Sequence, residues 1–253
     1  MNNKKKVIEA LAHTVFDHGA LSNPFYRRWL STPMKFYEVE IFARNYWART
    51  CRTATMVALS LLRAKHLSAR VEIVKNLYSE LGCGDSAKAH SVLLQNYLLD
   101  LLSRLANRTY TLDELGAGQI LPSTHVFIEE QDALYAPDGL GRPSSYVLGA
   151  LLAQEWLAYS MLTRLYEGAR NYQHLYTNND EFHERCEYFY IHIGDAEKEH
   201  KIQSVTAAAL ECDNEEDLIG LTTGFNRFLD ITENYWNGIS QAIEGGHALE
   251  SNA

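Results

Sequence analysis

The feature that most constrains the fold of this chain is the distribution of its prolines. Only five are present, at positions 24, 33, 122, 137 and 143, so residues 34–121 and 144–253 contain none. Proline interrupts helices because it lacks the backbone N–H donor and because its ring clashes with the preceding turn. Two long stretches of the chain are therefore free to form long helices.

The spacing of apolar residues indicates that these stretches are helical. Apolar side chains recur at intervals of three and four residues in the segment 144–170, as Val147, Leu148, Leu151, Leu152, Leu162 and Leu165 show. This period is typical of an amphipathic helix and not of a strand. The same criterion predicts helices near residues 4–17, 24–31, 35–64, 68–81, 86–106, 122–134, 144–171, 179–210 and 214–243, and no sheet. We expect an all-α bundle with a single domain over residues 1–253.

Short polar segments predict where helices begin and where loops lie. Asn23-Pro24 and Ser31-Thr32-Pro33 each place a capping side chain ahead of a proline, which is typical of a helix start. Gly116 to Gly118 and residues 136–143 predict loops, and the second loop is a candidate border of a pocket opening.

Composition excludes several classes of function. The net charge of −9 and the pI near 5.6 argue against non-specific binding to nucleic acid or anionic membranes, which needs a basic surface. No apolar run approaches the roughly 20 residues that span a bilayer, and the first residues lack the apolar stretch of a signal peptide. We therefore expect a cytoplasmic protein whose partner is a small molecule or another protein. No C-x-x-C pair is present, so neither a disulfide framework nor a zinc knuckle is indicated for the four cysteines, Cys51, Cys83, Cys186 and Cys212.

Three predicted helical segments carry ionisable side chains where a core helix normally has leucine. The segments 76–90, 150–158 and 188–200 contain the candidates Glu80, His90, Glu155, His192, Asp195, Glu197, Glu199 and His200. Glu155 is the most informative, because it lies on an apolar stripe and a buried unpaired carboxylate costs several kcal/mol unless it is neutralised or binds a cation. Mixed carboxylate and imidazole ligands suit iron or manganese, and helical bundles build dinuclear iron sites from inward-facing Glu and His.

Each candidate also has a simpler interpretation. Taken singly, Glu80 and Glu199 fit solvated helix residues, and His90 fits a hydrogen-bonded surface or core histidine. The metal hypothesis rests on the occurrence of all these residues together. A helical protein without enzymatic activity, which stores metal or binds a partner, is the alternative from another functional class.

The chain resembles the haem-oxygenase-like di-iron oxidases and oxygenases, which share their fold with the thiaminase-like TenA and PQQ-synthase proteins. The resemblance covers most of the chain. It rests on Asn23-Pro24-Phe25-Tyr26-x-x-Trp29, Phe42-Ala43-x-Asn45-Tyr46, Glu80-x9-His90, Leu148-Gly149-Ala150-x4-Glu155, the stretch from Tyr188 to His200, and Glu233-x-x-Trp236. The Pro-Phe-Tyr and Glu-x-x-Trp pieces mark the fold superfamily, whereas the Glu and His motifs in combination mark the oxidase branch.

Matched residue by residue, the resemblance implies a haem-oxygenase-like bundle with the metal ligands Glu80, His90, Glu155, His192 and His200. The family usually has His-x3-Asp-x2-His on one helical face. Here His192 and His200 are eight residues apart, which separates them by roughly 80° on an ideal helix. A π-bulge near Gly194 would absorb the extra residue. Glu197 then becomes the sixth ligand, because it keeps the acid-x2-His spacing, and Asp195 remains the alternative.

Glu80 and His90 raise the same difficulty, since an ideal helix would also separate them by roughly 80°. Gly82 and Gly84 lie between them. Glycine tolerates conformations that end a helix. We expect a break here that redirects both side chains.

The resemblance implies two Fe(II)/Fe(III) ions, dioxygen as co-substrate and a small amino-acid-like substrate. Outcomes in the family include N-oxygenation, oxidative C–C or C–N cleavage, and nitrile formation in natural-product biosynthesis. The 11% aromatic content is compatible with an aromatic substrate and equally with an ordinary core. An external electron donor and a homodimer are candidate partners, and no catalytic residue is assigned beyond the metal ligands.

The competing enzyme class is a TenA- or PQQ-synthase-like enzyme without metal. Thiaminase-like relatives use a cysteine on the helix that here carries Glu155, and residues 146–166 contain no cysteine. The PQQ-forming relatives need no such set of acids. Both considerations favour the metal-dependent interpretation.

Overall fold

The computed structural model describes residues 2–136, 141–193 and 195–250, without the side chains of residues 2, 195–198 and 247–250. Within these ranges the chain forms helices and no β-strand, which confirms the all-α prediction. The elements are α1 (Asn2–His13), η1 (Thr14–Asp17), α2 (Pro24–Ser31), α3 (Phe36–Thr50), α4 (Thr53–Arg63), α5 (Leu67–Glu80), η2 (Ser86–Lys88), α6 (His90–Ala106), α7 (Leu112–Ala117), α8 (Pro122–Leu134), α9 (Ser144–Ala169), η4 (Arg170–Leu175), α10 (Asn179–Arg185), α11 (Glu187–Ile193), α12 (Asp195–Leu210) and α13 (Glu215–Glu250).

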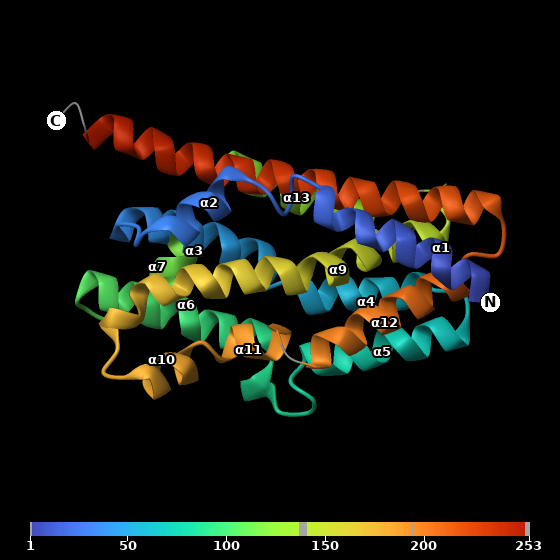
Figure 1. Ribbon diagram of the computed structural model, residues 1–253, viewed down its shortest axis with the longest axis horizontal. Helices are drawn as coiled ribbons and strands as arrows, with labels where there is room; N and C mark the ends of the chain where they lie inside the picture. Colours follow the sequence, from blue (N-terminus) through green and yellow to red (C-terminus); the bar gives the residue numbers. More distant parts are fainter. Residues whose placement is uncertain (1, 137–140, 194, 251–253) are drawn as a thin grey trace.

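Helix α9 runs through the middle of the bundle (Figure 1). Its most extensive contact is with α13, which extends along one side of the molecule, and α2, α4, α11 and α12 pack against α9 as well. With neighbours on several sides, α9 is buried over most of its residues and not along a single stripe. None of the helices in the described ranges combines the length and the low polarity needed to cross a lipid bilayer.

Several predicted helix boundaries are confirmed, and capping explains them. Helix α2 begins at Pro24, where Oδ1 of Asn23 accepts a hydrogen bond of 3.1 Å from the backbone N–H of Tyr26. Helix α3 begins at Phe36, and Oε2 of Glu38 accepts from the N–H of Lys35 at 2.7 Å. Side chains therefore satisfy backbone donors that a helix start leaves unpaired.

Two of the predicted long helices are broken. The helix predicted over 35–64 is interrupted at Cys51 and Arg52, where the hydroxyl of Thr53 donates to the carbonyl of Thr50 at 2.9 Å. Such local side-chain bonds compete with the helical hydrogen bonds. The helix predicted over 179–210 is interrupted at Cys186, between α10 and α11. The N–H of Cys186 donates to the carbonyls of Phe182 and His183 in a tightened last turn.

Smaller differences concern the ends of helices. The helix predicted over 86–106 begins only at His90, after the 3-10 turn η2. Helix α7 overlaps the loop predicted around Gly116, and its start is a capping box between Thr111 and Glu114. Helix α13 continues beyond residue 243 to Glu250. Of the loop predicted over 136–143, residues 137–140 lie outside the described part of the chain.

Helices α9 and α13 touch backbone to backbone at two glycines. A Cβ atom added at Gly149 would lie 1.9 Å from the carbonyl oxygen of Leu221, and one added at Gly224 would lie 1.9 Å from that of Tyr146. No side chain fits at either position, because both obstacles are backbone atoms. This close approach determines how α9, which also carries Glu155, is positioned against α13.

We predict that Gly149→Ala destabilises the protein by about 1–3 kcal/mol, the usual range for overpacking of a filled core. Urea unfolding measures the change. Gly116→Ala is the control, because nothing lies within 4 Å of the added Cβ and alanine favours an exposed helix by up to about 1 kcal/mol. Equal effects of the two substitutions would contradict the close approach.

Candidate metal centre

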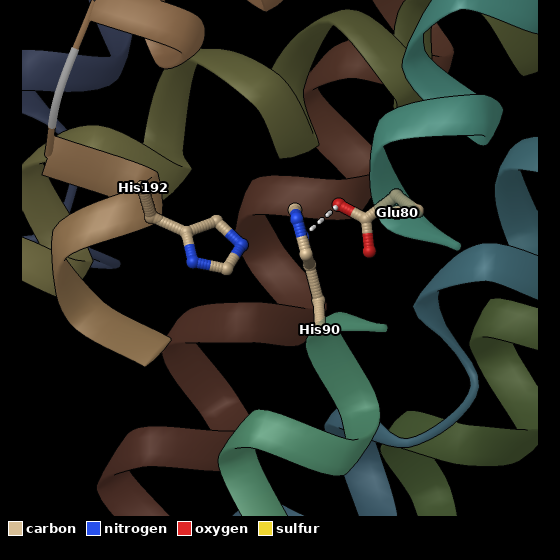
Figure 2. Close-up of side chains that lie close together, drawn as sticks. All are labelled: Glu80, His90 and His192. Carbon is tan, nitrogen blue, oxygen red and sulfur yellow. Dashed lines mark ion pairs between the residues drawn. The ribbon is translucent and has the colours of Figure 1, made fainter. Parts of the chain in front are cut away.

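Glu80 and His90 meet because the chain reverses between them. Glu80 is the last residue of α5 and His90 the first of α6. Between them Gly82, Cys83 and Gly84 have φ values of 79°, 55° and 97°, in the left-handed region that favours glycine. Oε1 of Glu80 and Nδ1 of His90 lie 3.1 Å apart (Figure 2). The predicted break is therefore present, and it redirects the two side chains toward each other.

His192 reaches the same point from α11. Its ring centroid lies 4.4 Å from that of His90, and the two rings are inclined at 69°. Figure 2 shows both rings and the Glu80 carboxylate gathered in one place. Nδ1 of His192 lies 2.6 Å from the carbonyl oxygen of Tyr188. Because a carbonyl oxygen only accepts, Nδ1 carries the proton and Nε2 keeps its lone pair.

The protonation of His192 suits a metal ligand. Burial, followed by the nearby charge of His90, lowers the pKa of His192 to about 3. The imidazole is therefore neutral at neutral pH, and its Nε2 lone pair is available. A backbone carbonyl that holds the opposite ring nitrogen is the usual arrangement behind a metal-bound histidine.

Glu80, His90 and His192 each offer one ligand atom within 4.8 Å of the others, and all three are buried. Burial raises the pKa of Glu80, but the histidines, His90 above all, lower it by more. The net shift is downward, so Glu80 is ionised at neutral pH. Nδ1 of His90 faces Glu80 but has no hydrogen-bond partner of acceptable geometry. A buried carboxylate beside an unsatisfied imidazole nitrogen fits a bound cation.

Glu155 and His200 form a second buried pair. Glu155 and His200 are only 4% and 5% exposed, although both residues are ionisable. Oε2 of Glu155 lies 3.8 Å from Nδ1 of His200, and Oε1 accepts from the amide of Gln154 at 3.2 Å. His200 is also among the groups that shift the pKa of Glu80 and of His192. The second pair therefore lies near the first three side chains.

The structure thus brings five of the six predicted ligands to one region of the core, from α5, α6, α9, α11 and α12. The side chains of Glu197, the predicted sixth ligand, and Asp195, its alternative, lie outside the described part of the structure. Gly194, where a π-bulge was predicted, lies outside it as well. The structure describes helix up to Ile193, in α11, and again from Asp195, in α12, so the predicted π-bulge stays untested. The choice between the two acids remains a prediction.

A cavity of about 60 Å³ adjoins these residues. Glu80, His90, Glu155 and His192 line it together with Tyr188. Further lining residues, which the sequence analysis did not single out, include Arg49, Gln131 and Gln154. One of these residues, Arg49, could have been recognised from its position in the sequence. Arg49 continues the buried stripe of Phe42 and Tyr46, so it is a charge among core residues, as Glu155 is.

Two tyrosines support the wall of the site. The ring of Tyr188 packs 4.8 Å from that of His192, and its hydroxyl lies 3.1 Å from the hydroxyl of Tyr46. Burial raises the pKa of both phenols, and both therefore stay protonated at neutral pH. The pair holds Tyr188 in place, and the carbonyl of Tyr188 in turn orients His192.

The fold and the site define a class of protein, a helical bundle with a buried carboxylate and histidine cluster suited to a metal. A family model described as iron-containing redox enzyme matches residues 40–233. The chain therefore belongs to this family of iron-containing redox enzymes. No curated protein shows significant sequence similarity to it.

Solved structures share the haem-oxygenase-like fold. A CADD-like protein of unknown function from Nostoc punctiforme PCC 73102 has a TM-score of 0.72 at 18% identity, covering 96% of this chain and 99% of that chain. A TenA homologue from Pseudomonas syringae pv. tomato str. DC3000 has 0.66 at 12%, covering 94% and 92%. A domain of unknown function with a heme oxygenase-like fold from Shewanella denitrificans OS217 has 0.64 at 16%, covering 97% and 94%. At such identities the likeness establishes the fold alone.

We predict that Fe(II), added without oxygen, raises the thermal unfolding midpoint of the protein, and that His192→Ala removes most of this rise. A ligand bound only by the folded state stabilises it by about 2.7 kcal/mol at one hundred times its dissociation constant. His18→Ala is the control, because His18 also faces two carboxylates but lies apart from the cavity. An iron-induced rise that survives in His192→Ala would contradict this site.

Proposed function

We propose that this protein is a non-haem di-iron oxidase or oxygenase that uses dioxygen to oxidise a small amino-acid-like substrate. The observation that carries the proposal is the burial of Glu80, His90 and His192 within ligand distance of one another, beside the Glu155–His200 pair. Two carboxylates and three imidazoles in a helical core match the mixed ligand set that dinuclear iron sites use. Membership of a family of iron-containing redox enzymes supports the choice of metal.

In this proposal the five described side chains hold the metal, and Glu197 or Asp195 completes the set. Two iron ions bound here would supply the redox chemistry with dioxygen. The protein supplies ligation, position and a dry surrounding. Gln154 donates to Glu155 and the Tyr188 carbonyl orients His192, so two ligands are held before metal arrives. Such preorganisation lowers the reorganisation needed on binding.

We propose that the apolar part of the cavity wall limits the access of water to the metal ligands. Leu157, Met161, Leu162 and Phe228 form its apolar wall. Exclusion of water protects an oxidising site from side reactions. We propose N-oxygenation, oxidative C–C or C–N cleavage, or nitrile formation as the outcome. An external electron donor would supply any electrons that the substrate does not provide.

We predict that the protein loaded without oxygen binds about two Fe(II) per chain and consumes dioxygen on mixing. Glu155→Gln should lose at least one iron and most of the oxygen consumption, because a neutral amide is a much weaker ligand than a carboxylate. Iron analysis and an oxygen electrode measure the two effects.

Glu211→Gln is the matched control. Glu211 is equally buried, but it accepts hydrogen bonds from Lys65, His66 and Ser144 and does not line the cavity. This variant is expected to be less stable and to keep both irons. Full iron binding and oxygen consumption in Glu155→Gln would refute the ligand assignment. Persistent iron without oxygen consumption in the unaltered protein would instead favour metal storage.

A further inference from the structure

Among the described side chains, no carboxylate pairs with the buried cation Arg49. It lies in the last turn of α3, is 7% exposed and lines the cavity that Glu80, His90, Glu155 and His192 also line. In the described part of the chain no acid forms an ion pair with it. Its Nε atom is buried and has no hydrogen-bond partner. A guanidinium cannot be deprotonated under ordinary conditions, so the charge remains and its burial is unfavourable.

The contacts that Arg49 does make compensate only in part. Its guanidinium carbon lies 4.9 Å from the ring centre of Phe127 and 5.3 Å from that of Tyr235. Nη1 lies 4.0 Å from the sulfur of Met161, a weak acceptor. Cation–π contacts offset some of the lost hydration. They leave the planar fork of N–H donors, which matches a carboxylate, without an anion to bind.

Gln131 brings a second unsatisfied group to the same cavity. It lies on α8, is 4% exposed, and its Oε1 atom is buried without a hydrogen-bond partner. Buried amide oxygens are normally hydrogen-bonded, and an orphaned one in a native structure calls for an explanation. The cavity therefore has both an unused cationic donor and an unused neutral acceptor in its wall.

We infer that Arg49 and Gln131 bind the head group of an α-amino carboxylate. The carboxylate pairs with the guanidinium of Arg49, and the ammonium group donates a hydrogen bond to Oε1 of Gln131. The inference rests on the proposed function in that it places this head group beside the candidate metal ligands. It deepens that function, because it names the two groups by which the chain recognises its substrate class.

The size of the cavity adds a condition on the substrate. At about 60 Å³ it is smaller than the roughly 150 Å³ cavity that holds a benzene molecule, so it has room for a head group and not for a large side chain. Its half-buried lining residues include Thr50, Cys51 and Thr53, at the break between α3 and α4. A longer substrate would extend toward the surface past this break.

Three small probes separate the two contacts. L-alanine carries both groups, L-alaninamide lacks the carboxylate, and propionate lacks the ammonium. Isothermal titration calorimetry on the full chain, iron-free and loaded with Fe(II) without oxygen, measures their dissociation constants. We expect L-alanine to bind at least tenfold more tightly than L-alaninamide, and several-fold more tightly than propionate.

Variants assign the preferences to residues. Arg49→Gln should remove the preference for L-alanine over L-alaninamide, and Arg49→Lys should recover only part of it, because lysine lacks the fork. Gln131→Leu should weaken L-alanine to the affinity of propionate and leave propionate unchanged. Gln203→Leu is the matched control, since Gln203 also has a buried, unpartnered Oε1 but does not line this cavity. It should change no dissociation constant.

A spectroscopic measurement on the unaltered chain covers the case in which Arg49 variants do not fold. In iron-free protein with labelled arginine, L-alanine should shift the Nε–H resonance of Arg49 downfield, and L-alaninamide should not. The inference would be overturned if L-alanine and L-alaninamide bound equally and the Nε–H resonance of Arg49 did not shift. Such a result would mean that Arg49 does not bind the carboxylate.

Iron content and oxygen consumption of the same samples test the proposed function separately. Carboxylate-selective binding in a chain that takes up no iron would support the head-group site and refute the di-iron proposal. Normal iron uptake and oxygen consumption without carboxylate-selective binding would support the di-iron proposal and refute the head-group site.

Discussion

The burial of Glu155 in the middle of α9 is the constraint on which the rest of this structure depends. A carboxylate in a helix with neighbours on several sides is stable only if other groups satisfy its oxygens or compensate its charge. Gln154 and His200 do so directly. Glu80, His90 and His192 line the same cavity as Glu155, and together they form a polar centre inside the bundle. The helices around α9 therefore contribute polar side chains to this centre as well as apolar packing.

Much of the fold follows from sequence because its signals are local. Pro24 after Asn23 sets the start of α2, and the run of apolar residues from Val147 to Leu165 marks α9. The breaks inside residues 35–64 and 179–210 are different. They coincide with local hydrogen bonds, that of Thr53 with Thr50 and those of the Cys186 N–H, which an apolar period does not reveal. Periodicity thus located helices and missed their interruptions.

Some residues of the candidate site could likewise be recognised in the sequence, and others could not. Glu155 and the two glycines after Glu80 could be recognised in sequence, because a charge in an apolar stripe and a glycine between two ligands each have a local meaning. The role of Gln131 could not. An unsatisfied amide is defined by the absence of a partner, and this depends on α3, α8 and α13 coming together in space. The fold shared with a TenA homologue does not decide the chemistry either, because function lies in the residues of the site.

The left-handed turn at Gly82, Cys83 and Gly84 has a consequence for the order in which the centre assembles. Glu80 and His90 are close in the chain, so bringing them together closes a short loop and loses little conformational entropy. Their approach to His192, and the position of Glu155 at the same cavity, join distant parts of the chain and need the bundle to be nearly complete. One half of the centre is thus encoded as a local hairpin of two helices. The folding chain can hold Glu80 and His90 together before the other half arrives.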